Sequence, residues 1–204
     1  MRFIGRKQEL KQLTEAWKKE DALILITGRP RFGKTSLIKE FVKDKNHLYF
    51  EVGPQSDRLN RVAFERVFKS HFGIQAPSSE MSAMEWLELF RLYSEKTEDG
   101  GKILVIDNFD QLYFENKSFL KIFKKAWQKY FKANGVTVIA AAREASWNRI
   151  LQSEHSAKKN LDRSNLFVGD VFYRNDVGIS PSRFQSADDS LRHYRRCSRV
   201  LAFL

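Results

Sequence analysis

The residues best suited to chemistry lie in one short run near the N-terminus. Residues 28–35 read Gly-Arg-Pro-Arg-Phe-Gly-Lys-Thr, which matches the pattern G-x-x-x-x-G-K-T of a phosphate-binding loop. Because glycine lacks a Cβ, backbone N–H groups in such a loop can turn toward phosphate oxygens. We expect Lys34 to reach the β- and γ-phosphates of a nucleoside triphosphate and the Thr35 hydroxyl to bind Mg²⁺. The helix that must follow adds the positive end of its dipole.

The segments on either side of the run have the patterns that such a loop needs. Residues 22–27 form a continuous apolar stretch, as expected for a buried parallel strand. After the loop, apolar residues recur at helical spacing from Leu37 to Val42. A strand, a loop and a helix in this order distinguish the motif from a glycine turn. The residues expected to line the phosphates are Gly28, Arg29, Pro30, Arg31, Phe32, Gly33, Lys34, Thr35 and Ser36.

A second part of the site follows the apolar run at residues 103–106. Asp107 ends this run, and a carboxylate at the carboxyl end of a strand can bind Mg²⁺ beside the loop. The alternative is a carboxylate that only caps the end of the strand. With the loop present upstream, the metal site is the favoured interpretation, and Thr35 and Asp107 are its expected ligands.

The residues after Asp107 bear on whether a water molecule can be activated. Asn108 can hold a water through its amide, but it cannot take a proton at pH 7. Asp110 either orients the water or caps the helix that follows. Residues 140–142 are all alanine and offer no polar group, and Arg143 is either a phosphate contact or a surface residue. The candidate catalytic residues are Lys34, Asp107, Asn108 and Asp110.

The elements that must position these residues alternate between strands and helices, which predicts an α/β fold. Apolar runs predict strands at residues 22–27, 47–52, 103–106 and 136–142, with a weaker fifth at 171–179. Apolar spacing predicts helices at residues 6–19, after the loop to 44, at 59–72, from a cap at Ser82, at 119–131 and at 190–204. Residues 148–163 read as polar and irregular. The expected architecture is a three-layer α/β/α sandwich around a mostly parallel five-stranded sheet, with a short helical C-terminal segment.

Composition and charge limit the class of protein. The chain has 204 residues, enough for one α/β domain, and no stretch of about 18 apolar residues that would predict a membrane span. The N-terminal residues are too polar for a secretory signal, and the single cysteine, Cys197, is compatible with a reducing compartment, so we expect a cytoplasmic location.

The net charge is +11, which is compatible with an anionic partner such as nucleic acid or a membrane surface. The lysines are scattered along the chain, however, and this favours a solvated surface over a nucleic-acid-binding face.

These residues together resemble the archaeal-type ATPase family, close to the AAA+ and signal-transducing (STAND-like) P-loop NTPases. Residues 3–10 look like the family's F-[VI]-G-R-x-x-E-L box, and the loop, the strand ending at Asp107 and residues 191–204 add to the likeness. In that family the N-terminal box lies over the adenine, which implies that Ile4, Gly5 and Arg6 bind the base. The resemblance implies ATP or ADP with Mg²⁺ as ligands. It also implies an AAA+-like ATPase domain at residues 1–180 and the start of a diverged helical lid at residues 181–204.

Three functions follow as hypotheses. The first is a Mg²⁺-dependent ATPase module, and the second is a nucleotide-dependent switch that hydrolyses ATP slowly or not at all. Asn108, the alanines at 140–142 and the altered residues 194–204 favour weakened hydrolysis. The third is a DNA-associated ATPase that uses the basic surface. The partners considered are therefore a nucleotide, a protein or a second copy of the chain, and nucleic acid.

Overall fold

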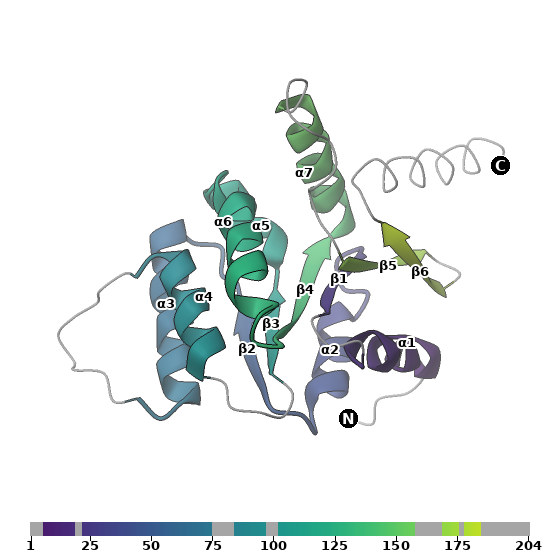
Figure 1. Cartoon of the computed structure of the whole chain (residues 1–204). Coiled ribbons are helices and arrows are strands. Elements are labelled where there is room, and N and C mark those ends of the chain that lie inside the picture. The colour runs from purple at the N-terminus through teal and green to yellow at the C-terminus, as the bar shows by residue number, and fades with distance from the viewer. Residues whose placement is uncertain are drawn as a thin grey trace.

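One sheet passes through the molecule, with helices on both of its faces (Figure 1). The computed structural model describes residues 6–18, 22–74, 84–96, 102–157, 169–175 and 178–184. Within these residues, six strands lie in the order β2-β3-β4-β1-β5-β6, all parallel except β6, which runs antiparallel to β5. The strands are β1 (Leu23–Gly28), β2 (His47–Glu51), β3 (Ile103–Asp107), β4 (Thr137–Arg143), β5 (Gly169–Asn175) and β6 (Gly178–Phe184).

Two layers of helices cover the sheet. The helices α1 (Lys7–Trp17) and α2 (Lys34–Val42) pack on one face, which we call the α2 face. The other face carries α3 (Asp57–His71), α4 (Trp86–Lys96), α5 (Phe109–Glu115), α6 (Phe119–Ala126), the π-helical turn η1 (Trp127–Phe131) and α7 (Glu144–Ala157). None of the described helices combines the length and the apolar character needed to cross a membrane.

The apolar runs of the sequence are explained by burial on both faces of the sheet. In β1, Leu23 and Leu25 pack into the core under α3 to α7, whereas Ile24 and Ile26 pack against α1 and α2. A strand covered on both sides has no solvent-facing position, and its sequence therefore reads as continuously apolar. The same alternation sends Asp107, at the end of β3, toward the α2 face, because Ile103 and Val105 point there.

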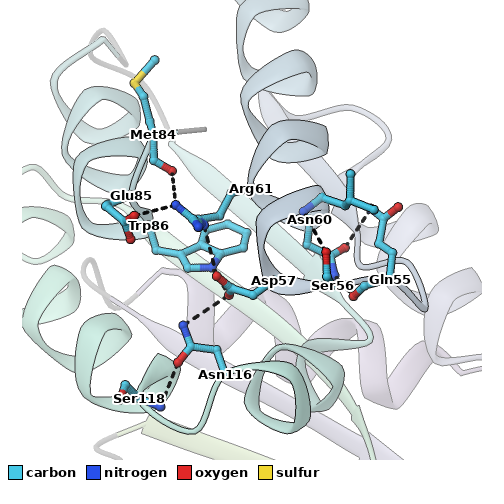
Figure 2. A network of polar contacts seen from close by, with 11 residues as sticks. Gln55, Ser56, Asp57, Asn60, Arg61, Met84, Glu85, Trp86, Asn116 and Ser118 are labelled. Carbon is cyan, nitrogen blue, oxygen red and sulfur yellow. Dashed lines mark hydrogen bonds and ion pairs between the residues drawn. The ribbon is translucent and has the colours of Figure 1, made fainter. Parts of the chain in front are cut away.

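A polar network joins the starts of α3 and α4 to the connection between α5 and α6 (Figure 2). Asp57 Oδ1 accepts hydrogen bonds from Trp86 Nε1 at 2.8 Å and from Asn116 Nδ2 at 3.3 Å. Asp57 Oδ2 accepts one from Arg61 Nε at 3.1 Å, and Arg61 Nη1 reaches Glu85 Oε1 at 2.7 Å. One carboxylate thus connects three segments that lie far apart in the sequence.

The predicted three-layer α/β fold with a mostly parallel sheet is confirmed, and two local predictions are wrong. The single strand predicted at residues 171–179 is a hairpin, β5 and β6, so the described sheet has six strands and not five. The segment interpreted as irregular from residue 148 is helical to Ala157. The helix considered after Asp107 is present as α5, but it starts at Phe109, before the residue that was expected to cap it.

Several expectations fall on residues that the structure does not describe. The helix predicted at 190–204 and the cap at Ser82 lie outside the described residues, as do Ile4 and Gly5. The boundary drawn between residues 180 and 181 falls within β6, and the lid assigned to residues 181–204 stays a prediction.

Candidate nucleotide-binding site

The phosphate-binding loop connects the end of β1 to the start of α2. Gly28 is the last residue of β1, and Gly33, with a φ of 68°, directly precedes the helix. A left-handed φ is readily available to glycine, and this explains its place at the turn into the helix. Helix α2 begins without a side-chain cap, so its N-terminal end faces the loop. Residues 29–32 form the exposed tip, and Ser36 lies exposed in the first turn of α2.

Lys34 lies across this loop. Its Nζ donates hydrogen bonds to the carbonyl oxygens of Gly28 at 2.9 Å and Arg29 at 3.1 Å. The ammonium is therefore held inside the curve of the loop, next to the N-terminal end of α2. Both features favour an anionic group at this place.

Arg6 holds the loop from outside. Its Nη1 donates to the carbonyl of Gly33 at 2.7 Å and its Nη2 to the carbonyl of Phe32 at 2.5 Å. A Cβ at Gly33 would lie 2.8 Å from Nη2 of Arg6, so a larger residue there would displace the Arg6 guanidinium. The structure thus gives Arg6 a contact with the loop that the sequence did not indicate, and its contact with the base stays a prediction.

The two expected metal ligands meet directly. Thr35 Oγ1 donates to Asp107 Oδ2 at 2.6 Å, although the residues are 72 positions apart and β4 lies between β1 and β3. Asp107 is only 3% exposed, and its Oδ1 accepts the backbone N–H of Asn108 at 2.9 Å. Because the Thr35 hydroxyl donates its hydrogen bond to Asp107, the lone pairs of the hydroxyl oxygen are available to a cation. A hydroxyl and a carboxylate are the oxygen ligands that Mg²⁺ takes beside a nucleotide phosphate.

Tyr49 is part of this site, and sequence reasoning missed it. Its hydroxyl donates to the same Asp107 Oδ2 at 2.6 Å. Burial, and then the hydrogen bond with Asp107, raises the pKa of Tyr49 above its usual value, so the phenol stays a neutral donor. The only signal in the sequence was strand alternation, which places Tyr49 and Glu51 on one face of β2 and Phe50 on the other.

The residues considered for water activation have other contacts. Asn108 has a left-handed φ of 58°, occupies the N-cap position of α5, and its Nδ2 lies 3.5 Å from the carbonyl of Val52. Asp110 is fully buried and accepts hydrogen bonds from the Nε of Arg143 at 3.0 Å and from its backbone N–H at 3.4 Å. Asp110 is therefore not the N-cap of this helix.

Arg143 lies at the end of β4, opposite Gly28 in the sheet, so its ion pair with Asp110 connects the edge of the loop to α5. The three alanines before it are buried within β4 and present no polar group at this edge. Of the sequence-predicted residues, the structure thus brings together Lys34, Thr35 and Asp107, and it directs Asp110 to Arg143.

Comparison with known proteins adds a family and a set of similar folds. Residues 3–175 match a family described as an ATPase domain predominantly from Archaea. The chain is 30% identical over 124 residues to the uncharacterized protein MJECL04 of Methanocaldococcus jannaschii, covering 60% of this chain and 25% of that protein. It is 48% identical over 44 residues to the uncharacterized ATP-binding protein MJ0423 of the same organism, covering 21% and 75%.

Solved structures share the fold. The Walker-type ATPase PABY2304 of Pyrococcus abyssi superposes with a TM-score of 0.55 at 21% identity, covering 74% of this chain and 48% of that one. Cdc6p of Pyrobaculum aerophilum gives 0.52 at 20% identity, covering 78% and 44%. The chain thus spans about a quarter of MJECL04 and less than half of each of these two structures.

Proposed function

Because the chain belongs to the family of ATPase domains found predominantly in Archaea, we propose that it binds Mg·ATP and acts as a nucleotide-dependent switch with slow hydrolysis. The observation that carries the proposal is the arrangement around the loop. The Lys34 ammonium lies 2.9 Å from the Gly28 carbonyl, inside the loop, and Thr35 and Asp107 meet beside it at 2.6 Å. This arrangement supports adjoining sites for the phosphates and the metal ion, as a metal-bound triphosphate requires.

Each part of the arrangement has a chemical task in this proposal. Lys34 and the N-terminal end of α2 neutralise the β- and γ-phosphates. Thr35 and Asp107 would hold Mg²⁺, which would supply positive charge to offset that of the phosphates. Arg6 keeps the carbonyls of Phe32 and Gly33 in place and so supports the shape of the loop.

Slow hydrolysis is supported by the residues that follow Asp107, where a general base would be needed. Asn108 follows Asp107 directly, and an amide cannot accept the proton of the attacking water. Asp110 is committed to Arg143, and the strand between β1 and β3 presents only alanines before Arg143. The remaining contribution to catalysis is electrostatic stabilisation by Lys34 and the helix.

A switch also needs a route from the loop to the rest of the molecule. The ion pair of Arg143 with Asp110 leads from the edge of the loop to α5, and the Tyr113 hydroxyl lies 2.6 Å from Ser153 Oγ of α7. In the proposed switch, a change of nucleotide moves α5 and α7 through these contacts. A protein partner or a second copy of the chain would bind differently to the two arrangements of these helices.

The substitution Lys34→Ala tests the binding site. We expect it to weaken ATP binding roughly 100-fold or more, because the phosphates lose a charge-assisted partner. Isothermal titration calorimetry with a slowly hydrolysed ATP analogue and Mg²⁺ gives the affinity. The matched control is Lys43→Ala, since Lys43 ends α2 on the surface beside Glu40 and should leave the affinity unchanged. Equal affinities for the wild type and Lys34→Ala would refute the proposal.

The same samples test the switch. We expect bound ATP to be recovered largely intact after many minutes, and the mass from light scattering to differ between ADP and the ATP analogue when a second copy is the partner. Turnover at several per second in the isolated chain would show that the protein is an ordinary ATPase and that the slow-switch proposal is wrong.

A further inference from the structure

The carboxylate of Asp107 is held by three donors. Thr35 Oγ1 and Tyr49 OH both donate to Oδ2, each at 2.6 Å, and the backbone N–H of Asn108 donates to Oδ1 at 2.9 Å. Both oxygens are therefore engaged, and rotation of the carboxylate would break at least one of these bonds. Charge-assisted hydrogen bonds of this kind are the strong ones in proteins.

Strand register explains why a tyrosine reaches this place. Glu51 of β2 is opposite Asp107 of β3, so Tyr49 is the previous side chain on the same face of the neighbouring strand. Positions two apart on a strand are about 6.8 Å apart, a gap that a long aromatic side chain can span with its terminal hydroxyl. A phenylalanine would fill the same space without donating a hydrogen bond.

The ring of Tyr49 is itself fixed between two elements. It packs at the edge of the core under α1 and α2, and Lys39 Nζ of α2 lies 5.2 Å from the ring centroid. Helix α2 also carries Lys34 and Thr35. The same helix therefore supplies one expected metal ligand, Thr35, and packs against the Tyr49 ring, whose hydroxyl contacts the other ligand, Asp107. A cation over an aromatic face adds a modest attraction to this packing.

We propose that Tyr49 is a positioning residue that fixes the Asp107 carboxylate for the metal ion of the nucleotide complex. The proposal rests on the Mg·ATP binding proposed above, because Asp107 matters only when the nucleotide carries its cation. Tyr49 acts through Asp107 and touches neither nucleotide nor metal. Metal-dependent binding should therefore depend on the phenol hydroxyl, whereas metal-free binding to the loop should not.

The test compares nucleotide affinity with and without Mg²⁺ in the wild type, Tyr49→Phe and Asp107→Asn. The probe is a slowly hydrolysed ATP analogue, measured by calorimetry in Mg²⁺ and in a chelator. For Tyr49→Phe we expect the gain in affinity on adding Mg²⁺ to fall on the order of tenfold, with the affinity in chelator unchanged. Tyr130→Phe is the matched control, since Tyr130 is partly buried against the core on the opposite face of the sheet.

The outcomes separate the two proposals. The proposed function fails if the wild type binds no nucleotide. It also fails if Mg²⁺ raises the nucleotide affinity of neither the wild type nor Asp107→Asn. If the wild type gains affinity from Mg²⁺ and Tyr49→Phe gains just as much, the inference about Tyr49 is overturned. Equal losses in Mg²⁺ and in chelator would mean that Tyr49 only supports the fold, and this too overturns it. Thermal unfolding of each variant shows whether the fold is retained.

Discussion

At the scale of single residues, the shape of the loop depends on the close packing of the Arg6 side chain against Gly33. Gly33 has a φ of 68°, and the Arg6 guanidinium lies so close that an added Cβ would be 2.8 Å from Nη2. Arg6 in turn holds the carbonyls of Gly33 and Phe32. A substitution at either position therefore changes the environment of the other.

The substitution Gly33→Ala should destabilise the protein by about 2 kcal/mol, combining left-handed strain with the displacement of Arg6. In an Arg6→Ala background the displacement disappears and only the strain remains, so the same substitution should cost about 0.5–1 kcal/mol less. Urea unfolding of the wild type, both single variants and the double variant gives this coupling energy. An identical cost in both backgrounds would contradict the contact between Arg6 and the loop.

The site was predictable where its signal is local. The loop and Asp107 were found because their neighbours in sequence carry the pattern, a strand before each of them and a helix after the loop. Tyr49 and the pair of Asp110 with Arg143 were not found, since these contacts join residues 58 and 33 positions apart. Such contacts depend on strand order and register, which no local pattern encodes.

At the scale of elements, α3 and α4 depend on a single carboxylate. Asp57 accepts hydrogen bonds from Trp86, Arg61 and Asn116 (Figure 2). Trp86 also stacks on Phe90 in the core, with ring centroids 5.5 Å apart. The buried indole N–H needs an acceptor, because an unpaired buried donor is costly. The Asp57 carboxylate therefore holds the first turn of α3 next to the first turn of α4.

We expect Asp57→Ala to lower the free energy of unfolding by about 2–3 kcal/mol, because the buried Trp86 N–H loses its acceptor and Arg61 loses one of its carboxylate partners. Urea denaturation provides the measurement. Glu85→Ala is the control, since the Glu85 side chain is 75% exposed and an exposed partner contributes about 0.5 kcal/mol or less. If the two variants lose similar stability, Asp57 does not organise the helices.

The elements that were mispredicted show where the pattern fails. Helix α7 buries Trp147, Ile150 and Leu151 at helical spacing, but the polar residues that follow conceal the pattern in the sequence. One strand is predicted at residues 171–179 where the structure has β5 and β6, because the weak alternation gives no clear sign of a second strand. Residue 181, within β6, is a proline. Proline is tolerated there since β6 is the edge of the described sheet.

At the scale of the whole molecule, the chain carries a net charge of +11, which could attract an anionic partner. Several described lysines lie over aromatic rings, with Nζ 5.2 Å from the Tyr49 centroid for Lys39, 4.2 Å from that of Phe41 for Lys45, and 4.3 Å from that of Tyr113 for Lys117. Lys39 lies in α2, Lys45 in the connection from α2 to β2, and Lys117 in the connection from α5 to α6. Within the described residues, these three cations thus lie at separate places, in contrast to the clustered stripe that marks a nucleic-acid face.

We therefore expect duplex DNA to bind weakly and without sequence preference, and the complex to be lost as salt rises from about 50 to 200 mM. The reason is that scattered cations give a few simultaneous phosphate contacts, each of which releases counterions and is sensitive to salt. Fluorescence anisotropy with labelled duplexes measures the salt slope, in ADP and in the ATP analogue, with Lys34→Ala as the control for nucleotide. A complex that survives the higher salt would support the DNA-associated alternative, and a complex that forms in one nucleotide state alone would make DNA the partner of the switch. A steep loss that is the same in both nucleotides would leave the charge with a general role in solvation.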